Sequence, residues 1–215
     1  MPNINKMVIM DWGGVIDNDN NSINGWKART KSIIRRLGNS DDEISTWATF
    51  DVDDKKYNIC EINDDNLLDK WISNVITKYS LSCNKEEFLD VYKEEYANVI
   101  YYKDIIEILY KTKKYCQIGI LSNLTKLDKD RLGKQVDFSK LDYVGLSFEL
   151  GEIKPNDKIY ELVEEQTNIE PNNILFIDNR IDNINAARKR GWNTLLATGE
   201  DKEFIWDKIM EFVNK

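Results

Sequence analysis

Histidine is absent from the 215-residue chain, and its absence removes whole classes of catalytic and metal site. The chain has no Ser-His-Asp or Cys-His catalytic arrangement and no His-ligated metal site. Cysteine is scarce: Cys60, Cys83 and Cys116 form no Cys-x-x-Cys pair, which indicates reduced thiols in a cytoplasmic protein. Any chemistry is therefore expected to depend on carboxylates, lysine, hydroxyl groups and a hard cation.

Long hydrophobic runs and an excess of positive charge are also missing. No stretch approaches the ~18 apolar residues of a membrane span, and the N-terminal "MPNINKMVIMD" lacks a secretory signal pattern. The 38 acidic and 30 basic residues give a formal net charge of −8. Because an acidic chain repels nucleic acid backbones and anionic membrane surfaces, we expect neither as a partner.

The chain does contain enough apolar residues for a core, 41% of the total, in two different patterns. Residues 6–11 form a short apolar run typical of a buried strand. From residue 103 onwards, helical and strand patterns alternate with short connections. This alternation predicts an α/β fold, a Rossmann-like parallel sheet flanked by helices.

The block at 17–99 interrupts that alternation, because only helical spacing is found in it. One such pattern includes Trp71, Val75 and Tyr79. We therefore expect an inserted all-helical cap domain at 17–99 and a discontinuous core domain made of residues 1–16 and 100–215.

Polar side chains follow the predicted strands at the carboxyl edge of the sheet, where open parallel sheets bind ligands. They are Asp11, Ser122 with Asn123, Lys154 and Asp178. A strand end followed by a helix start offers free backbone N–H groups and a positive dipole end, which suits a phosphate. Two carboxylates at neighbouring strand ends supply hard oxygen ligands of the kind that Mg²⁺ prefers.

Four segments carry these residues in order: "DWGGVI", "GILSNLT", "LGEIKPNDKIY" and "LFIDNRIDNINAARKRGW". Together they resemble the four ordered motifs of the haloacid dehalogenase (HAD) superfamily. The resemblance covers residues 6–16 and about 100–198 and is closest to small helical-cap phosphatases that act on sugar phosphates and similar metabolites. It implies a hydrolase whose partner is a small phosphorylated molecule.

By this resemblance, Asp11 is the nucleophile that attacks phosphorus and forms an aspartyl-phosphate. Lys154 is implied to neutralise both Asp11 and the substrate phosphate, which makes it catalytic and substrate-binding. Ser122 and Asn123 are implied to contact the phosphoryl oxygens, although both residues also suit a simple helix N-cap. Gly14 is expected to let the backbone pass close beside the phosphoryl group.

The resemblance also implies a Mg²⁺ cofactor. Its implied ligands are the carboxylates of Asp11 and Asp178 and the backbone carbonyl of Gly13. Asp182 lies about one helical turn beyond Asp178, where it either holds a metal-bound water or faces solvent. Asn183 is a candidate to support the same loop.

Gly13 departs from the family pattern, because most phosphatases of the family carry a second aspartate there. That aspartate protonates the leaving alcohol and then activates water. Position 179, often a second acid, is Asn179. A positioned general acid is worth ~10²–10⁴ in rate, so its absence leaves several functions open.

Three functions fit this pattern. The preferred one is a Mg²⁺-dependent phosphatase of a small phosphorylated metabolite, such as a sugar phosphate, in which water, a cap residue, Asp17 or Asp19 replaces the missing acid. The second is a dehalogenase-like hydrolase, since a leaving halide needs no proton. The third is a non-catalytic or very slow phosphometabolite-binding protein.

Overall fold

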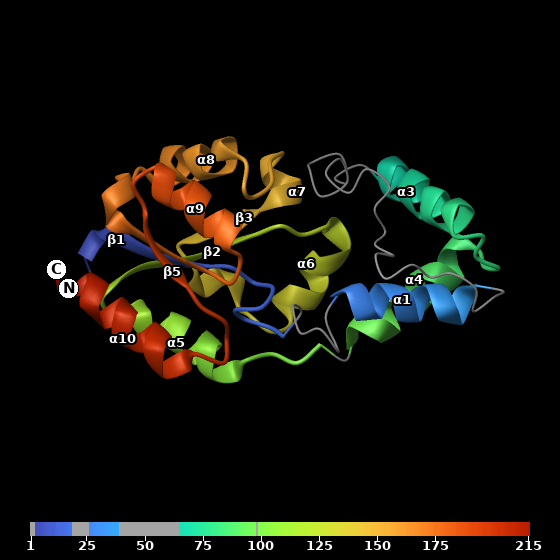
Figure 1. Ribbon diagram of the computed structural model, residues 1–215, viewed down its shortest axis with the longest axis horizontal. Helices are drawn as coiled ribbons and strands as arrows, with labels where there is room; N and C mark the ends of the chain where they lie inside the picture. Colours follow the sequence, from blue (N-terminus) through green and yellow to red (C-terminus); the bar gives the residue numbers. More distant parts are fainter. Residues whose placement is uncertain (1–2, 19–25, 39–64, 98) are drawn as a thin grey trace.

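A five-stranded sheet forms the centre of the part of the molecule that contains both termini (Figure 1). The computed structural model describes residues 3–18, 26–38, 65–97 and 99–215. The strands of the sheet are β1 (Asn3–Met10), β2 (Cys116–Ser122), β3 (Tyr143–Leu146), β4 (Ile174–Asp178) and β5 (Asn193–Leu196). Their order is β3-β2-β1-β4-β5 and every pairing is parallel, which confirms the predicted α/β class with a Rossmann-like sheet.

The central place of β1 fixes where the first candidate residue lies. Met10 is opposite Ile120 of β2 on one side and Ile177 of β4 on the other. Asp11 therefore leaves the sheet between the ends of β2 and β4. Its backbone N–H donates to the carbonyl of Ile177 over 2.8 Å, so its position is anchored to the neighbouring strand.

Side chains that alternate along the strands divide between two buried layers, as the period of two requires. Val8 and Met10 join the apolar cluster formed with α5 (Lys103–Thr112) and α10 (Lys202–Val213). Met7 and Ile9 join the cluster formed with α8 (Asp157–Thr167) and α9 (Ile181–Lys189). Both faces of the sheet are therefore covered by helices (Figure 1).

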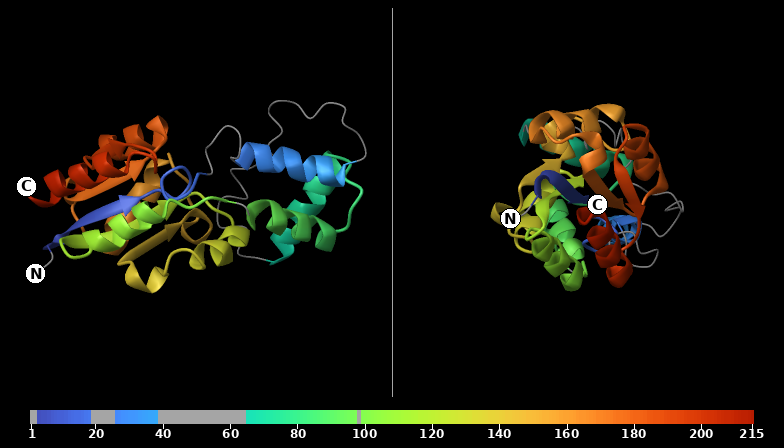
Figure 2. Two further views of the ribbon diagram at one scale, coloured as in Figure 1. Left: turned by 90° about the horizontal axis from the view of Figure 1, so that it is seen from below. Right: turned by 90° about the vertical axis from the view of Figure 1, so that its left-hand side faces the viewer.

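A helical unit, made of α1 (Trp26–Leu37), α3 (Asp65–Lys78) and α4 (Lys85–Ala97), lies at the end of the molecule far from both termini (Figures 1 and 2). It has an apolar cluster of its own, in which Trp71, Ile72 and Phe88 are buried. This cluster explains the aromatic residues at helical spacing. Residues 19–25, 39–64 and 98 of the expected cap domain lie outside the described residues.

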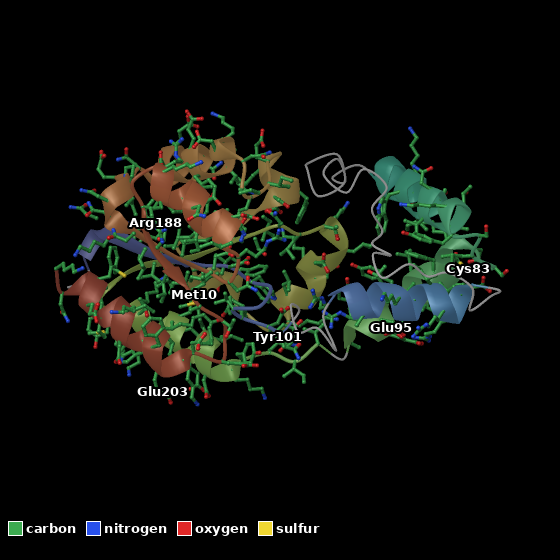
Figure 3. The ribbon with its side chains drawn as sticks, viewed as in Figure 1. Met10, Cys83, Glu95, Tyr101, Arg188 and Glu203 are labelled. Atoms are coloured by element: carbon green, nitrogen blue, oxygen red, sulfur yellow. The ribbon has the colours of Figure 1, made fainter. Side chains whose placement is uncertain are left out.

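Two linkers, at 17–18 and 99–102, join this unit to the sheet and pair with each other. The N–H of Asn18 donates to the carbonyl of Ile100 over 3.0 Å, and the N–H of Tyr102 donates to the carbonyl of Ile16 over 2.9 Å. Figure 3 labels Tyr101 between these two bonded positions. The pairing gives the connection a defined geometry at the sheet end of the helical unit.

The connections after β2 and β3 contain short elements. They are α6 (Lys126–Gly133), η2 (Phe138–Lys140), α7 (Ser147–Leu150) and η3 (Pro171–Asn173). The alternating pattern did not predict α7, whose four residues are too few to show a helical period. None of the helices within the described ranges is long and apolar enough to cross a membrane.

Candidate functional site

Lys154 connects two aspartates at the carboxyl edge of the sheet. Its Nζ lies 2.6 Å from Oδ1 of Asp11 and 2.8 Å from Oδ2 of Asp178. The same Nζ donates to the carbonyl oxygen of Leu121 in β2 over 2.8 Å. All three ionisable side chains are buried, so one ammonium faces two carboxylates inside the protein. We call these three residues the edge cluster.

Asn123 holds the backbone of Lys154 in place. Its Nδ2 donates to the Lys154 carbonyl over 2.9 Å, and its Oδ1 accepts from the Lys154 N–H over 2.8 Å. Both ends of the Asn123 amide are therefore used within the protein. The structure gives Asn123 two bonds that position the lysine, and its expected contact with a phosphate stays a prediction. Ser122, the buried last residue of β2, is adjacent to it.

Asp178 accepts hydrogen bonds on both of its oxygens. Oδ2 receives Nδ2 of Asn183 over 2.9 Å as well as Lys154, and Oδ1 receives the N–H of Arg180 over 2.7 Å. Asp182 is exposed in the first turn of α9, so its neighbour Asn183 makes the contact. The sequence names Asn183 as a candidate to support this loop, and the structure shows that it does so through its bond to Asp178.

Asp11 is less completely bonded than Asp178. Its Oδ1 accepts from Lys154 and from the N–H of Trp12 over 2.7 Å, whereas no described residue donates to Oδ2. Burial and the negative charge of Asp178 raise the pKa of Asp11 to about 7, although Lys154 opposes this rise. One carboxylate oxygen of Asp11 is therefore left for a ligand or a proton.

The residues after Asp11 form a tight turn closed by Asp17. Gly14 has φ 85°, a left-handed conformation that favours glycine. Its N–H donates to the Asp17 carbonyl over 2.8 Å, and its carbonyl accepts from the N–H of Gly199 over 3.0 Å. Both backbone groups of Gly14 are therefore bonded within the protein, and its expected place beside a phosphoryl group stays a prediction. Gly13 is half-buried at the start of this turn.

Asp17 is fully buried and its carboxylate is held within the protein. Oδ2 accepts from Nε1 of Trp12 over 3.0 Å and lies 3.8 Å from Nη1 of Arg131. Burial raises the pKa of Asp17 to about 6, and Arg131 opposes the rise. Asp17 is thus a support of the turn, which speaks against its use as the missing acid. Asp19, the other candidate, lies outside the described residues.

The oxygen atoms of the edge cluster fit a hard cation. Two buried carboxylates share one ammonium, so the cluster retains an excess of negative charge when both are ionised. Next to Asp178, Oδ1 of Asn179 is buried and has no hydrogen-bond partner among the described residues. Within the described part of the chain, no three His, Cys, Asp or Glu side chains gather as a metal site. Such a cation would need further oxygens from backbone, phosphate or water, as Mg²⁺ often has.

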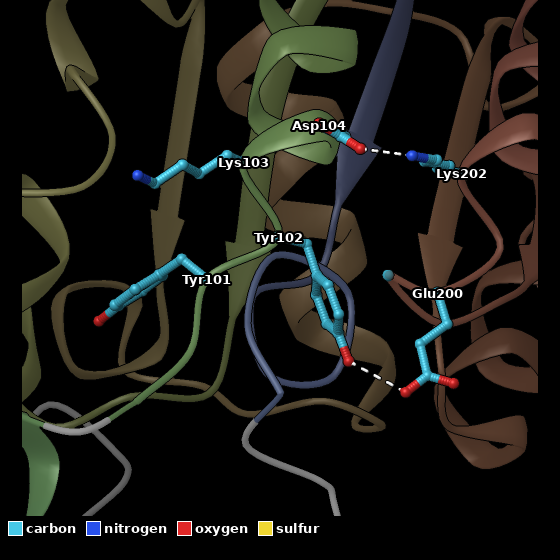
Figure 4. A pocket seen from close by; sticks show the side chains of 7 residues that line it. Tyr101, Tyr102, Lys103, Asp104, Glu200 and Lys202 are labelled. Atoms are coloured by element: carbon cyan, nitrogen blue, oxygen red, sulfur yellow. Dashed lines mark hydrogen bonds and ion pairs between the residues drawn. The ribbon is translucent and has the colours of Figure 1, made fainter.

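A pocket of about 520 Å³ lies beside the second linker, and no member of the edge cluster lines it (Figure 4). Its lining residues are Tyr101, Tyr102, Lys103, Asp104, Gly199, Glu200 and Lys202. Lys202 pairs with Asp104 over 2.5 Å, and the hydroxyl of Tyr102 lies 3.4 Å from Oε1 of Glu200. Within the pocket, Asp104 and Lys202 therefore neutralise each other.

Solved structures similar to this chain share its fold. A HAD family enzyme from Bacteroides thetaiotaomicron, in complex with magnesium and inorganic phosphate, is 18% identical with a TM-score of 0.72, covering 95% of this chain and 100% of that one. A predicted HAD-like family hydrolase from Porphyromonas gingivalis is 15% identical with a TM-score of 0.72, covering 99% and 100%. An L-2-haloacid dehalogenase from Xanthobacter autotrophicus, with chloropropionic acid covalently bound, is 16% identical with a TM-score of 0.58, covering 88% and 76%.

The sequence itself matches one family, described as haloacid dehalogenase-like hydrolase, over residues 30–197. That match covers well over half of the chain and contains Ser122, Lys154 and Asp178, although it begins after Asp11. No curated protein matches the chain. The family match and the shared fold agree with the resemblance of the four motifs, and the chain belongs to the haloacid dehalogenase-like hydrolases.

Proposed function

We propose that the protein is a Mg²⁺-dependent phosphatase of a small phosphorylated metabolite, such as a sugar phosphate. The observation that carries this proposal is the edge cluster, in which Asp11, Lys154 and Asp178 meet at the carboxyl edge of the sheet. The Bacteroides relative with magnesium and inorganic phosphate supports the choice of ligand class.

In this proposal, Oδ2 of Asp11 attacks phosphorus while the bond from phosphorus to the leaving oxygen breaks. The product is an aspartyl-phosphate and a released alkoxide, which takes a proton from water. Water then attacks phosphorus, the bond to Asp11 breaks, and inorganic phosphate leaves. Lys154 favours the ionised form of Asp11 that the first step needs, because its ammonium lies 2.6 Å from the carboxylate.

The residues proposed to hold Mg²⁺ are Asp11, Asp178 and the carbonyl of Gly13. When bound there, the cation supplies positive charge against the developing charge on the phosphoryl oxygens. Ser122, at the end of β2, is proposed to contact those oxygens together with Lys154. Asn183 keeps Asp178 in place through its 2.9 Å hydrogen bond. The helical unit is proposed to act as a cap that excludes bulk water.

The missing general acid limits the leaving group. Gly13 has no side chain, and Asp17 is buried with its oxygens bonded to Trp12 and Gly14. Without a donor at this position, an alkyl leaving group departs as a strong base. Aryl and acyl phosphates have stable leaving anions, so we expect them to react faster by about 10²-fold or more.

A dehalogenase-like hydrolase is the second candidate. Gly13 favours it, because a halide leaves without a proton, and the Xanthobacter dehalogenase shares the fold. Asp178 beside Asp11 weighs against it, since a second buried carboxylate repels an anionic 2-haloacid. The third candidate is a phosphometabolite-binding protein that hardly turns over.

The experiment measures phosphate release from para-nitrophenyl phosphate and acetyl phosphate, with MgCl₂ and with EDTA. Asp11→Asn is the test variant, and Asp207→Asn is the matched control because Asp207 is exposed on α10. We expect release that needs Mg²⁺, is lost in Asp11→Asn and is kept in the control. Release that survives Asp11→Asn contradicts the nucleophile assignment. Chloride release from 2-chloropropionate favours the dehalogenase, and phosphate-ester binding without turnover favours the binding protein.

A further inference from the structure

A second buried group of charged residues lies where the helical unit meets the sheet. Arg131 of α6 is its centre: Nη2 lies 3.2 Å from Oδ1 of Asp128, and Nη1 lies 3.8 Å from Oδ2 of Asp17. Nη1 also donates to the hydroxyl of Tyr101 over 2.7 Å. Asp17 and Tyr101 belong to the two linkers, so one guanidinium bonds both of them. We call Arg131, Asp128, Asp17 and Tyr101 the junction cluster.

The junction cluster also contacts the helical unit. The guanidinium of Arg131 lies over the ring of Tyr96 in α4, 5.2 Å from its centroid. Tyr92, stacked on Tyr96 at 4.4 Å, has its hydroxyl 3.5 Å from Oδ1 of Asp128. Arg29 of α1 approaches the Tyr96 ring as well, at 4.9 Å. These contacts join α1 and α4 to α6, a helix of the sheet domain.

A short path leads from the junction cluster to Lys154. Oδ2 of Asp128 accepts from the hydroxyl of Thr125 over 2.8 Å and from its N–H over 3.2 Å, which fixes the start of α6. Thr125 is two residues beyond Asn123, and Asn123 holds the backbone of Lys154. A chain of contacts therefore connects α4, through Asp128 and Thr125 of the α6 start, to the loop that positions the ammonium of the edge cluster.

We propose that Arg131 is a positioning residue that sets the orientation of the helical unit against the sheet by bonding both linkers and α4 at once. The planar guanidinium suits this task, because it offers several N–H donors in fixed directions and a face for an aromatic ring. A lysine at this position has one point charge and cannot bond Asp128, Asp17 and Tyr101 while covering Tyr96. The proposal concerns a residue that neither the family match nor the proposed chemistry assigns.

Hydrogen–deuterium exchange on the full chain tests the proposal without relying on activity. The variants are Arg131→Met, which keeps an unbranched apolar stem and removes the charge, and Arg131→Lys, which keeps the charge. Lys134→Met is the control, because Lys134 is exposed at the end of the same helix. The readout is the exchange of the Asn18 and Tyr102 amides, which bond across the linkers, against the amides of β2.

We expect Arg131→Met to speed linker exchange by about tenfold or more and to leave β2 unchanged, since local opening is governed by local contacts. Arg131→Lys should recover part of the protection, and Lys134→Met should match the wild type. Unchanged linker exchange in Arg131→Met overturns the proposal. An equal rise in β2 also overturns it, because Arg131 would then only stabilise the fold.

Tyr101→Phe keeps the proposal testable if Arg131→Met does not fold. It removes the 2.7 Å hydrogen bond to Arg131 alone, and we expect about threefold faster linker exchange. No change in that variant, with Arg131→Met unfolded, overturns the proposal. Kinetics with para-nitrophenyl phosphate add a second readout: if the proposed function holds, Arg131→Lys should raise KM more than it lowers kcat. Absence of phosphatase activity leaves the exchange result intact.

Discussion

The edge cluster and the junction cluster both place one cation between two buried aspartates, and they differ in how completely the oxygens are bonded. In the edge cluster, Lys154 is 2.6 and 2.8 Å from its two partners, and Oδ2 of Asp11 has no donor among the described residues. In the junction cluster, Arg131 is 3.2 and 3.8 Å from its partners. There, Trp12 donates a further hydrogen bond to Asp17, and Thr125 and Tyr92 donate further hydrogen bonds to Asp128.

The comparison shows two uses of the same buried charges. The compact ammonium leaves one oxygen of Asp11 without a donor among the described residues. Burial and the charge of Asp178 raise the pKa of Asp11 to about 7, so its carboxyl group changes protonation near neutral pH. In the junction cluster, Arg131 and neighbouring N–H and O–H donors bond both oxygens of Asp128. The same guanidinium contacts both linkers and α4. The first arrangement suits chemistry and the second suits fixed geometry.

Removal of the central cation of the edge cluster should have the largest effect. Lys154→Met leaves Asp11 and Asp178 buried without a counter-charge. Breaking a buried ion pair in this way costs about 3–5 kcal/mol of unfolding free energy. Urea denaturation at pH 7 measures this loss.

The matched control is Lys158→Met on α8. Lys158 pairs with Glu161 over 2.8 Å, but both side chains are substantially exposed. Exposed pairs contribute about 0–1 kcal/mol, so the control should stay within that range. An equal loss in both variants would mean that burial does not distinguish Lys154, and the contrast between the two clusters would fail.

Asp11→Asn should separate the clusters through pH. The folded-state pKa of Asp11 is raised from 3.8 to about 7, so its protonated form is favoured in the folded protein. The protonated carboxyl group of Asp11 contributes its full stabilisation of the folded state below pH 3.8. This contribution is lost as pH rises through about 7. Without Mg²⁺, we expect Asp11→Asn to be more stable than the wild type at pH 8, by on the order of 2 kcal/mol.

Thermal denaturation in EDTA at several pH values between 4 and 8 measures the difference in Tm. The gap between Asp11→Asn and wild type should widen as pH rises. Asp17→Asn is the comparison from the junction cluster, because the pKa of Asp17 is raised only to about 6. The difference in Tm between Asp17→Asn and wild type should therefore stop growing at a lower pH than the difference for Asp11→Asn. Identical profiles for the two variants would contradict the difference in environment.

The sequence predicted the edge cluster better than the junction cluster, for a physical reason. Asp11 and Asp178 end apolar strands, and parallel strands bring their carboxyl ends to one edge. Asn123 and Asn183 were candidates, but their bonds to Lys154 and Asp178 depend on loop geometry that residue spacing does not show. Residues 39–64 were predicted to belong to the cap domain, and they lie outside the described residues.

No local sequence pattern predicts the junction cluster. Arg131 and Asp17 are 114 positions apart, and each stands in a segment with an ordinary explanation, a helix and a turn. Their meeting depends on how α6 packs beside the linkers, which is a tertiary property. Charged residues with a helical period are usually solvated, so a single sequence favours the wrong interpretation of Arg131.

Addition of Mg²⁺ should stabilise the protein through the edge cluster and do so more strongly at high pH. A carboxylate must lose its proton to bind a metal ion, and the pKa of Asp11 is about 7. A saturating excess of about 10–30 times Kd gives roughly 1.4–2 kcal/mol at pH 8. The gain should be smaller at pH 5.5. Tm measured with MgCl₂ and with EDTA gives both values.

CaCl₂ and KCl serve as controls for this prediction. General ionic strength screens the surface charges of the acidic chain, so KCl at matched ionic strength reports that contribution alone. A Mg²⁺ effect of the same size in Asp11→Asn, or one independent of pH, would show that the ion binds elsewhere.

The smallest predicted effect distinguishes two neighbouring residues of α9. Asn183 is buried and donates to Oδ2 of Asp178 over 2.9 Å, whereas Asp182 is exposed. Asn183→Ala removes a hydrogen bond to a buried carboxylate, and we expect a loss of about 1–2 kcal/mol. Asp182→Ala should change stability by less than about 0.5 kcal/mol, as surface substitutions generally do. Urea denaturation of both variants measures the difference. If Asp182→Ala instead lowers the Mg²⁺-dependent gain in Tm as much as Asn183→Ala does, Asp182 reaches the metal through water and the edge cluster extends to the start of α9.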